Sequence, residues 1–280
     1  MTDIRVWVDG RIVDPDTPAV SAVDHGVTVG DGAFETAKIE AGVPFAVTRH
    51  LRRLDRTMAG LGLPAADHDR IREGIDAVLV GEPIDFGRLR FTVTGGRGPL
   101  GSDRHDCDLT HIVTAVPHAP PGDHGSVVTV PWVRNERAAT AGLKTTSYAD
   151  NVIALAYAKA RGALEAVFAN TRGELCEATG SNVFVVVDGA LSTPPLSSGC
   201  LAGITRELVV EWCRADGVEV VERPLPLDVL TRADEVFLTS SIKDVFPVSG
   251  VDGRTLPAPG PVTERARAVW QRHAAQGSDP

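Results

Sequence analysis

The sequence has 280 residues, of which 43% are apolar and 23% are charged, and its formal net charge is −9. This length allows one large domain or two modest ones, and the composition is that of an ordinary soluble globular protein. The acidic balance argues against nucleic acid or an anionic membrane as a partner. No apolar run approaches the roughly 20 residues that span a bilayer, and the N-terminus lacks the order of a signal peptide. We therefore expect a cytoplasmic protein.

Strand and turn signals dominate the N-terminal third. Apolar and polar residues alternate over 4–13 around Asp9-Gly10, and a similar pattern over 34–47 turns at 40–42. Alternation interrupted by such turn residues is typical of paired antiparallel strands. Both stretches therefore predict hairpins.

Helical spacing follows the second hairpin. Apolar residues recur every three or four positions over 51–61, and Pro64 is expected to stop that helix. A second helix is expected over 67–80 and a strand over 89–94. These elements predict a small α+β unit.

The stretch 116–125 contains three prolines and two glycines and fits neither helix nor sheet. It is the best linker in the chain. We therefore expect a small N-terminal domain over 1–117, a linker over 118–125 and a large domain over 126–280.

The large domain is expected to be rich in strands, with a hairpin at Asp188-Gly189 and helices over 148–161 and 205–215. Strands and helices do not alternate regularly, which disfavours a doubly wound sheet. The pattern favours an α+β fold with a pseudo-barrel of mostly antiparallel strands.

Cysteine and histidine spacing predicts no metal site. No two cysteines form a CxxC pair, and no histidines accompany them at zinc-binding spacing. We expect four reduced thiols without a shared role. The residues considered are Cys107, Cys176, Cys200, Cys213, His25, His50, His105 and His111.

Lys144 stands between an apolar residue and two threonines, just before a predicted helix. A lone lysine of this kind is often a surface residue whose stem packs on apolar neighbours. The alternative is an amine held in a dry pocket, where a lowered pKa makes it a nucleophile able to form a Schiff base.

Two further patterns complement this amine. Glu177 follows a predicted strand and is either a solvated turn residue or a carboxylate aimed at a basic atom of a bound ring. Gly203 precedes a helical pattern whose start is either capped by Thr205 or forms a seat for phosphate. Together, amine, carboxylate and anion seat match the aldehyde, pyridine nitrogen and phosphate of pyridoxal phosphate.

These pieces, in this order and spacing, resemble the class IV (fold-type IV) pyridoxal phosphate enzymes. That family includes branched-chain aminotransferases, D-amino acid transaminases, (R)-amine transaminases and aminodeoxychorismate lyases. The resemblance covers nearly the whole chain through the motifs VDHGVTVGDGAFET, HLRRL, LKTTSYADNVIA, ELCEATGSNVF, GITRELV and ADEVFLTSSIKDVFPV. It implies a small N-terminal α/β domain, a larger pseudo-barrel domain, pyridoxal phosphate between them, and a homodimer whose neighbouring subunit closes the substrate pocket.

The resemblance also implies roles for individual residues. Lys144 would be the Schiff-base lysine, Glu177 would pair with the pyridine nitrogen, and Arg53 would clamp the phosphate. Tyr148 follows Lys144 by four residues, whereas the tyrosine of branched-chain enzymes follows by five, so that tyrosine's role is not assigned to it. The remaining cofactor contacts would come from Leu201, Gly203, Ile204, Thr205, Ser240 and Ser241.

Four residues are expected to contact the substrate. Phe34 and Lys38 lie in a motif that looks like that of D-amino acid transaminases, whereas branched-chain enzymes more often carry arginine near Lys38. The stretch 87–101 lacks both the Tyr-x-Arg pattern of branched-chain enzymes and the Arg-x-His loop of the best-known D-transaminases. Arg90 or Arg97 would then bind the substrate carboxylate, the alternative for each being surface charge.

Transamination is the favoured chemistry, with a D-amino acid or (R)-amine as donor and an α-keto acid as acceptor. Aminodeoxychorismate lyase activity is the first alternative, because the loop TGGRGPLG looks somewhat like that of the lyases. A branched-chain L-amino acid transaminase is the second. A non-enzymatic cofactor-binding or interaction protein is disfavoured by the presence of Lys144, Glu177 and Arg53 together.

Overall fold

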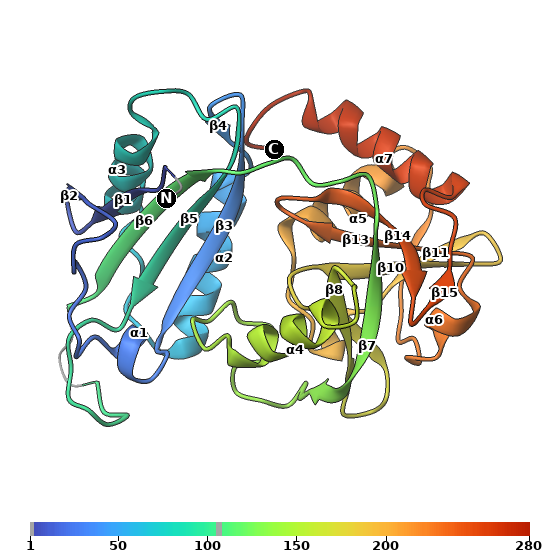
Figure 1. The fold of residues 1–280 in the computed structure, drawn as a ribbon, viewed down its shortest axis with the longest axis horizontal. Coiled ribbons are helices and arrows are strands. Elements are labelled where there is room, and N and C mark those ends of the chain that lie inside the picture. Colours follow the sequence, from blue (N-terminus) through green and yellow to red (C-terminus); the bar gives the residue numbers. More distant parts are fainter. Residues whose placement is uncertain (1–2, 105–107) are drawn as a thin grey trace. The chain divides into compact units, whose positions relative to one another are not determined.

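The computed structural model describes residues 3–104 and 108–280, so Cys107 and His105 lie outside the described residues. The chain forms two compact units (Figure 1). The first contains the described residues of 1–120 together with 143–148 and 278–280, and the second contains 121–142 and 149–277. Lys144 thus packs with the first unit, although residues 121–142, which precede its segment in sequence, belong to the second.

The first unit is built on a six-stranded antiparallel sheet with the order β2-β1-β6-β5-β3-β4. Both predicted hairpins are confirmed. At the first turn Asp9 and Gly10 have φ of 46° and 92°, the left-handed pair that a tight hairpin turn requires. The predicted strand at 89–94 begins three residues earlier. The strands are β1 (Arg5–Val8), β2 (Arg11–Val13), β3 (Gly32–Glu40), β4 (Val43–Pro44), β5 (Phe86–Thr94) and β6 (Thr110–Pro117).

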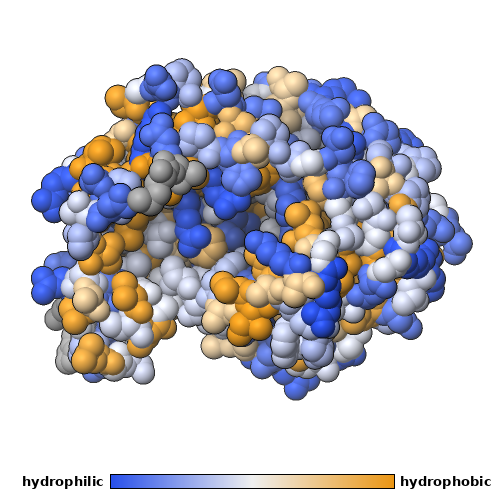
Figure 2. Space-filling view, in the orientation of Figure 1, coloured by the Kyte–Doolittle hydropathy of each residue, from blue (hydrophilic) through white to orange (hydrophobic). Residues whose placement is uncertain are grey.

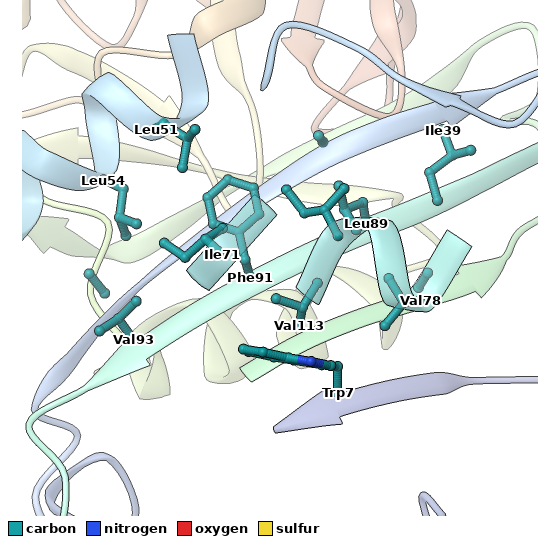
Figure 3. Packing of buried hydrophobic residues seen from close by; sticks show 14 of the residues in the cluster. Trp7, Ile39, Leu51, Leu54, Ile71, Val78, Leu89, Phe91, Val93 and Val113 are labelled. Carbon is teal, nitrogen blue, oxygen red and sulfur yellow. The ribbon is translucent and has the colours of Figure 1, made fainter. Parts of the chain in front are cut away.

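One face of this sheet packs on helices α2 (Val47–Leu61) and α3 (His68–Leu79), and a short helix α1 (His25–Thr28) precedes β3. Successive residues of a strand point to opposite faces, so alternate positions of β3 and β5 enter the core. Figure 3 shows this packing around Phe91. The buried cluster includes Trp7, Ile39, Leu51, Leu54, Ile71, Leu89, Phe91 and Val113. The intervening positions, among them Phe34 and Arg90, therefore belong to the opposite face.

Helix α2 ends before Pro64, which is a correction to the predicted stop. Its last residue is Leu61, and Gly62 forms the C-cap with φ of 67°. The amide of Gly62 donates to Ala59 and Met58 carbonyls. Glycine adopts this left-handed conformation without steric cost, so it terminates the helix and the proline only follows.

The second unit contains a curled, half-barrel sheet of nine strands, which confirms the predicted α+β class. Its path is β12-β11-β10-β13-β14-β7-β8-β9, with β15 paired to β14. The pairs β11–β12, β14–β7 and β7–β8 are parallel, and the others are antiparallel. The strands are β7 (Gly125–Arg134), β8 (Glu165–Asn170), β9 (Leu175–Ala178), β10 (Asn182–Val187), β11 (Ala190–Thr193), β12 (Val220–Glu222), β13 (Glu235–Ser240), β14 (Asp244–Val251) and β15 (Arg254–Thr255).

Four α-helices and one short 3-10 helix accompany this sheet in the described residues. Their bounds are α4 (Ala149–Lys159), η1 (Leu196–Ser198), α5 (Ile204–Ala215), α6 (Val229–Arg232) and α7 (Pro261–Ala274). Helix α4 buries Asn151, Ala154 and Ala158, yet Val152 and Ile153 are more than half exposed. Figure 2 shows apolar atoms gathered over this region. No described helix is long and apolar enough to cross a membrane.

Candidate active site

Lys144 is anchored by its backbone to two elements of the first unit. Its carbonyl accepts the amide hydrogen of Phe34 at 3.0 Å, which places it beside β3. Its own amide donates to Thr57 Oγ1 of α2 at 3.3 Å. The next residue, Thr145, forms an isolated β-bridge with Ala33. The lysine therefore stands on a short segment fixed from both sides rather than on a mobile loop.

The amine of Lys144 lies against aromatic rings. Its Nζ is 4.4 Å from the ring centroid of Phe34 and 5.9 Å from that of Tyr148. The two rings meet edge to face, with centroids 5.3 Å apart. Phe34 is 4% exposed. Cation–π contact of this kind holds the amine in one place while the rings keep water from that side.

Arg90 lies against the same phenylalanine. Its Cζ is 3.8 Å from the Phe34 ring centroid, so the ring brings the guanidinium and the Lys144 amine together. Within the described part of the chain, Arg90 makes one hydrogen bond, a 3.4 Å contact from Nε to Thr92 Oγ1. Among the described residues, none provides a carboxylate partner for it. Arg90 is thus an exposed cation beside the lysine, on the open face of the sheet.

Arg53 belongs to a buried triad on the helix-covered face. Its Nε and Nη2 donate to the two carboxylate oxygens of Glu35 at 2.8 and 2.6 Å. Nδ1 of His50 lies 2.6 Å from the same carboxylate. All three residues are at most 5% exposed. A two-pronged pair of this type fixes the orientation of the planar guanidinium, and it uses the donors on Nε and Nη2.

Burial and the neighbouring charges determine the protonation states of Glu35 and His50. Burial alone would raise the pKa of Glu35, but the charge and hydrogen bonds of Arg53, together with His50, lower that pKa to about 2. Burial lowers the pKa of His50, and the positive charges of Arg53 and Lys144 oppose its protonation further. At neutral pH the triad therefore contains an ionised Glu35 and a neutral His50 that donates from Nδ1.

The other two predicted substrate residues of the first unit are Lys38 and Arg97. Lys38 is buried, and its Nζ pairs with Glu40 at 2.9 Å and lies 5.7 Å from the Phe45 ring centroid. Arg97 is exposed in the loop after β5, where its backbone forms a β-bridge with Asp24. The cation–π contacts thus bring together Phe34, Arg90 and Lys144, whereas the contacts described for Lys38 and Arg97 are with other residues.

Glu177 of the second unit is held by a hydrogen bond and an ion pair. Its Oε2 accepts the amide hydrogen of Leu201 at 2.9 Å, and its Oε1 lies 3.3 Å from Nε of Arg134. Arg134 also donates from Nη2 to Asn151 Oδ1 at 2.9 Å and stacks on the Phe168 ring at 4.1 Å. The side chain of Glu177 is 14% exposed, so the carboxylate is fixed in place yet still accessible.

The start of α5 has no side-chain cap. Gly203 is the N-cap residue, and Thr205 lies inside the helix, which corrects the alternative of a terminus capped by Thr205. A Cβ on Gly203 would collide with Asn182 Oδ1, and Asn182 in turn donates to the Leu201 carbonyl at 2.8 Å. Helix starts of this kind present amide donors and a positive dipole end to an anion.

The remaining predicted cofactor residues lie in the first turn of α5 and at the end of β13, both in the second unit. Ile204 and Thr205 form the first turn of α5 and are 3% and 4% exposed. Ser240 ends β13, and its Oγ accepts the amide of Lys243 at 3.3 Å. Ser241 is half-buried in the turn that follows. The structure directly connects Glu177 with Leu201, and Leu201 with the Gly203 turn through Asn182.

Sequence reasoning missed the residues that hold the predicted ones. Glu35 and His50 fix Arg53, Thr57 holds the lysine backbone, and Arg134 holds Glu177. A signal for Glu35 was present, because a charged residue at a core-facing position of a strand requires a buried partner. Nothing in the spacing of Arg134 distinguished it from a surface arginine.

The donor set fits pyridoxal phosphate. The amine of Lys144 lies against aromatic rings. The carboxylate of Glu177 is fixed by an ion pair with Arg134 and a hydrogen bond from the Leu201 amide. Helix α5 starts without a side-chain cap at Gly203, where a Cβ would collide with Asn182. A metal is a poorer match, since no group of three or more potential ligands occurs in the described part of the chain.

The described cysteines form no disulfide: Cys176, Cys200 and Cys213 are buried free thiols.

Comparison with known proteins agrees with this chemistry. The family model described as Amino-transferase class IV matches residues 32–251. A Methanocaldococcus jannaschii protein, named provisionally as a branched-chain-amino-acid aminotransferase, is 33% identical over 90% of both chains. A D-alanine aminotransferase of Bacillus licheniformis is 30% identical over 96% of both.

A Mycobacterium tuberculosis relative carries two activities in its name. It is called a bifunctional aminodeoxychorismate lyase / D-amino acid transaminase and is 30% identical over 90% of this chain and 92% of its own. Among solved structures, the pyridoxal phosphate-bound form of a hypothetical aminotransferase from the same organism superposes with a TM-score of 0.86. It is 29% identical and covers 99% of this chain and 100% of its own.

Proposed function

Because the chain belongs to the class IV aminotransferases, which use pyridoxal phosphate, we propose that it transfers the amino group of a D-amino acid, or of an (R)-primary amine, to an α-keto acid. The observation that carries the proposal is the guanidinium of Arg90, which shares the Phe34 ring with the amine of Lys144. A transaminase binds an amino acid and a keto acid in turn, and both present a carboxylate beside the reacting carbon.

Each residue has a task in this proposal. Bound pyridoxal phosphate supplies an electron sink for the electrons left on the substrate carbon when its proton departs. Nζ of Lys144 accepts that proton and returns it, and the rings of Phe34 and Tyr148 exclude water from one side of Nζ. Glu177, whose negative charge is fixed by Arg134, holds a proton on the pyridine nitrogen. Arg53 and the start of α5 bind the phosphate.

Arg90 would bind the substrate carboxylate. Arginine presents donors in a flat fork that matches a carboxylate, and the Phe34 ring supports the guanidinium from one side. Lys38 is less suited, because Glu40 already neutralises its charge at 2.9 Å. Lys144 and Arg90 belong to the first unit, and Glu177 belongs to the second.

Two alternatives have specific support. The bifunctional Mycobacterium tuberculosis relative favours aminodeoxychorismate lyase activity, which would use the same lysine, glutamate and phosphate contacts. The Methanocaldococcus jannaschii relative favours a branched-chain L-amino acid donor. Residues that all these reactions share cannot distinguish them, so the substrate must be tested directly.

A donor panel tests the proposal. The purified enzyme, loaded with pyridoxal phosphate, is mixed in turn with D-alanine, L-leucine, (R)-1-phenylethylamine and aminodeoxychorismate, with 2-oxoglutarate as acceptor for the first three. We expect pyruvate from D-alanine. A keto product from L-leucine alone would establish the branched-chain alternative, and 4-aminobenzoate alone would establish the lyase. Borohydride should fix the cofactor to the peptide that contains Lys144, and attachment at Lys159 or Lys243 would contradict the lysine assignment.

The role of Arg90 is tested by a matched pair of variants. Arg90→Ala should lower kcat/KM for D-alanine by roughly ten- to a hundredfold, the equivalent of about 1.5–3 kcal/mol for a hydrogen bond to a charged group, and should spare (R)-1-phenylethylamine, which has no carboxylate. Arg88→Ala is the control, because Arg88 is exposed on the same face of β5 two residues earlier. Equal losses with both donors would make Arg90 structural.

The homodimer implied by the resemblance also remains a proposal. Light scattering of the eluting protein during gel filtration gives its mass, and one copy has a mass of 29.6 kDa. We expect twice that value.

A further inference from the structure

Helix α2 begins without a cap of its own. Its N-cap residue is Ala46, which has φ of 58° and contributes no side-chain hydrogen bond. The first amides of a helix have no partner within the helix, and a polar side chain normally accepts from them. For α2, that acceptor comes from a segment 231 residues away in sequence.

Residues 278–280 supply the missing acceptors. The carboxylate of Asp279 accepts from the amide of Thr48 at 2.9 Å and from its hydroxyl at 2.6 Å. The carbonyl of Ser278 accepts from the Ala46 amide at 2.6 Å, and that of Pro280 accepts from Arg49 Nε at 2.9 Å. Asp279 thereby performs the work of an N-cap aspartate, and its negative charge lies at the positive end of the helix dipole.

The capped helix carries two contacts of the proposed cofactor site. Arg53, in its second turn, forms the two-pronged pair with Glu35. Thr57, one turn further, accepts the backbone amide of Lys144. At Gly60, a Cβ would come within 2.7 Å of the Leu143 side chain, so the helix also packs closely against the residue that precedes the lysine.

We propose that Asp279 is a positioning residue: by capping α2 it orders the helix that aims Arg53 at the cofactor phosphate and supports the backbone of Lys144. The proposal rests on the proposed function in one respect, namely that Arg53 and Lys144 contact the cofactor. It makes residues 278–280 a determinant of how long the enzyme retains pyridoxal phosphate, through their contacts with the start of α2.

The test compares three variants of the cofactor-loaded enzyme. Asp279→Ala removes the acceptor, and Asp279→Asn keeps a side-chain oxygen that can accept from Thr48. Ser278→Ala changes a neighbouring side chain that makes no hydrogen bond with any described residue, because only its backbone carbonyl takes part in the contact with Ala46. The first measurement is hydrogen exchange in peptides covering the start of α2. The second is the rate at which cofactor is lost into a scavenger, followed by its absorbance.

We expect Asp279→Ala to speed exchange at the start of α2 and cofactor loss by about 3- to 30-fold, the range that corresponds to losing an N-cap. Asp279→Asn should restore most of both, and Ser278→Ala should match wild type. Unchanged exchange in Asp279→Ala, or no rescue in Asp279→Asn, would overturn the capping assignment. Faster exchange with an unchanged rate of cofactor loss would overturn the link to the cofactor.

One further variant separates this proposal from the proposed function. If Arg53→Ala retains its cofactor as long as wild type does, the phosphate assignment fails, while the exchange measurement still reports on the cap. If Arg53→Ala releases the cofactor but Asp279→Ala does not, the phosphate assignment stands and the positioning role of Asp279 is refuted.

Discussion

Replacing Glu35 with glutamine should cost the protein about 3 kcal/mol of stability at neutral pH. Glu35 is fully buried, and its pKa falls from 4.5 to about 2. Each pKa unit corresponds to about 1.4 kcal/mol, so a fall of this size contributes roughly 3 kcal/mol to folding. Removing one partner of a buried ion pair typically costs about 3–5 kcal/mol, which agrees with this magnitude.

The pH dependence gives the prediction its sign. Because the folded-state pKa of Glu35 is depressed, its contribution is fully present above pH 4.5 and is lost as the pH falls towards 2. The difference in free energy of unfolding between wild type and Glu35→Gln should therefore be largest near pH 7 and should shrink between about pH 5 and pH 2.

Urea unfolding followed by circular dichroism, at a series of pH values, measures that difference. Glu73→Gln is the matched control, because Glu73 is exposed on α3 in the same unit. A Glu35→Gln variant as stable as wild type at pH 7, or a difference that does not change with pH, would refute the account of the triad.

Three further variants address the cofactor contacts. Glu177→Gln should bind pyridoxal phosphate but turn over roughly 10²-fold more slowly, about 2.7 kcal/mol of barrier; an unchanged rate would make Glu177 a turn residue. Arg53→Ala should lose cofactor on dialysis far more than it loses rate in excess cofactor, and if it stays loaded, Arg52→Ala is the next variant to dialyse. Gly203→Ala should weaken cofactor binding because its Cβ displaces Asn182 from its place beside Leu201; equal affinity by titration would show that the turn can yield.

Short sequence patterns predicted those elements whose geometry depends only on neighbouring residues in the chain. Asp9-Gly10 and Asp188-Gly189 both form hairpin turns with positive φ at the two central residues, since few other residues tolerate that conformation. Helix α2 followed from its spacing, whereas its end depended on a backbone conformation at Gly62 that the presence of Pro64 obscured. Helix α7 and strand β14 were not anticipated as elements, although the last family motif reached into β14.

In the candidate site, too, some residues could be predicted from the sequence and others could not. Family motifs named Lys144, Glu177 and Arg53, but their partners come from distant parts of the chain. Arg134 becomes recognisable only once β7 has brought it to Glu177. Conversely, Lys38 matches the D-amino acid transaminase motif, yet its amine forms an ion pair with the neighbouring Glu40. Pairings of this kind depend on three-dimensional packing, which spacing along one sequence does not encode.

The first unit is built from three separate stretches of the chain, and this limits where the protein can be joined to a relative in a chimera. The stretch 118–124 is a natural place to join halves of two relatives, because it lies between β6 and β7 and a junction there interrupts neither strand. A chimera joined at that point would take β3 and α2 from one parent and the 143–148 segment from the other. The lysine would then meet a foreign Phe34 ring and a foreign Thr57 hydroxyl. To keep these contacts native, residues 143–148 must come from the same parent as the N-terminal part.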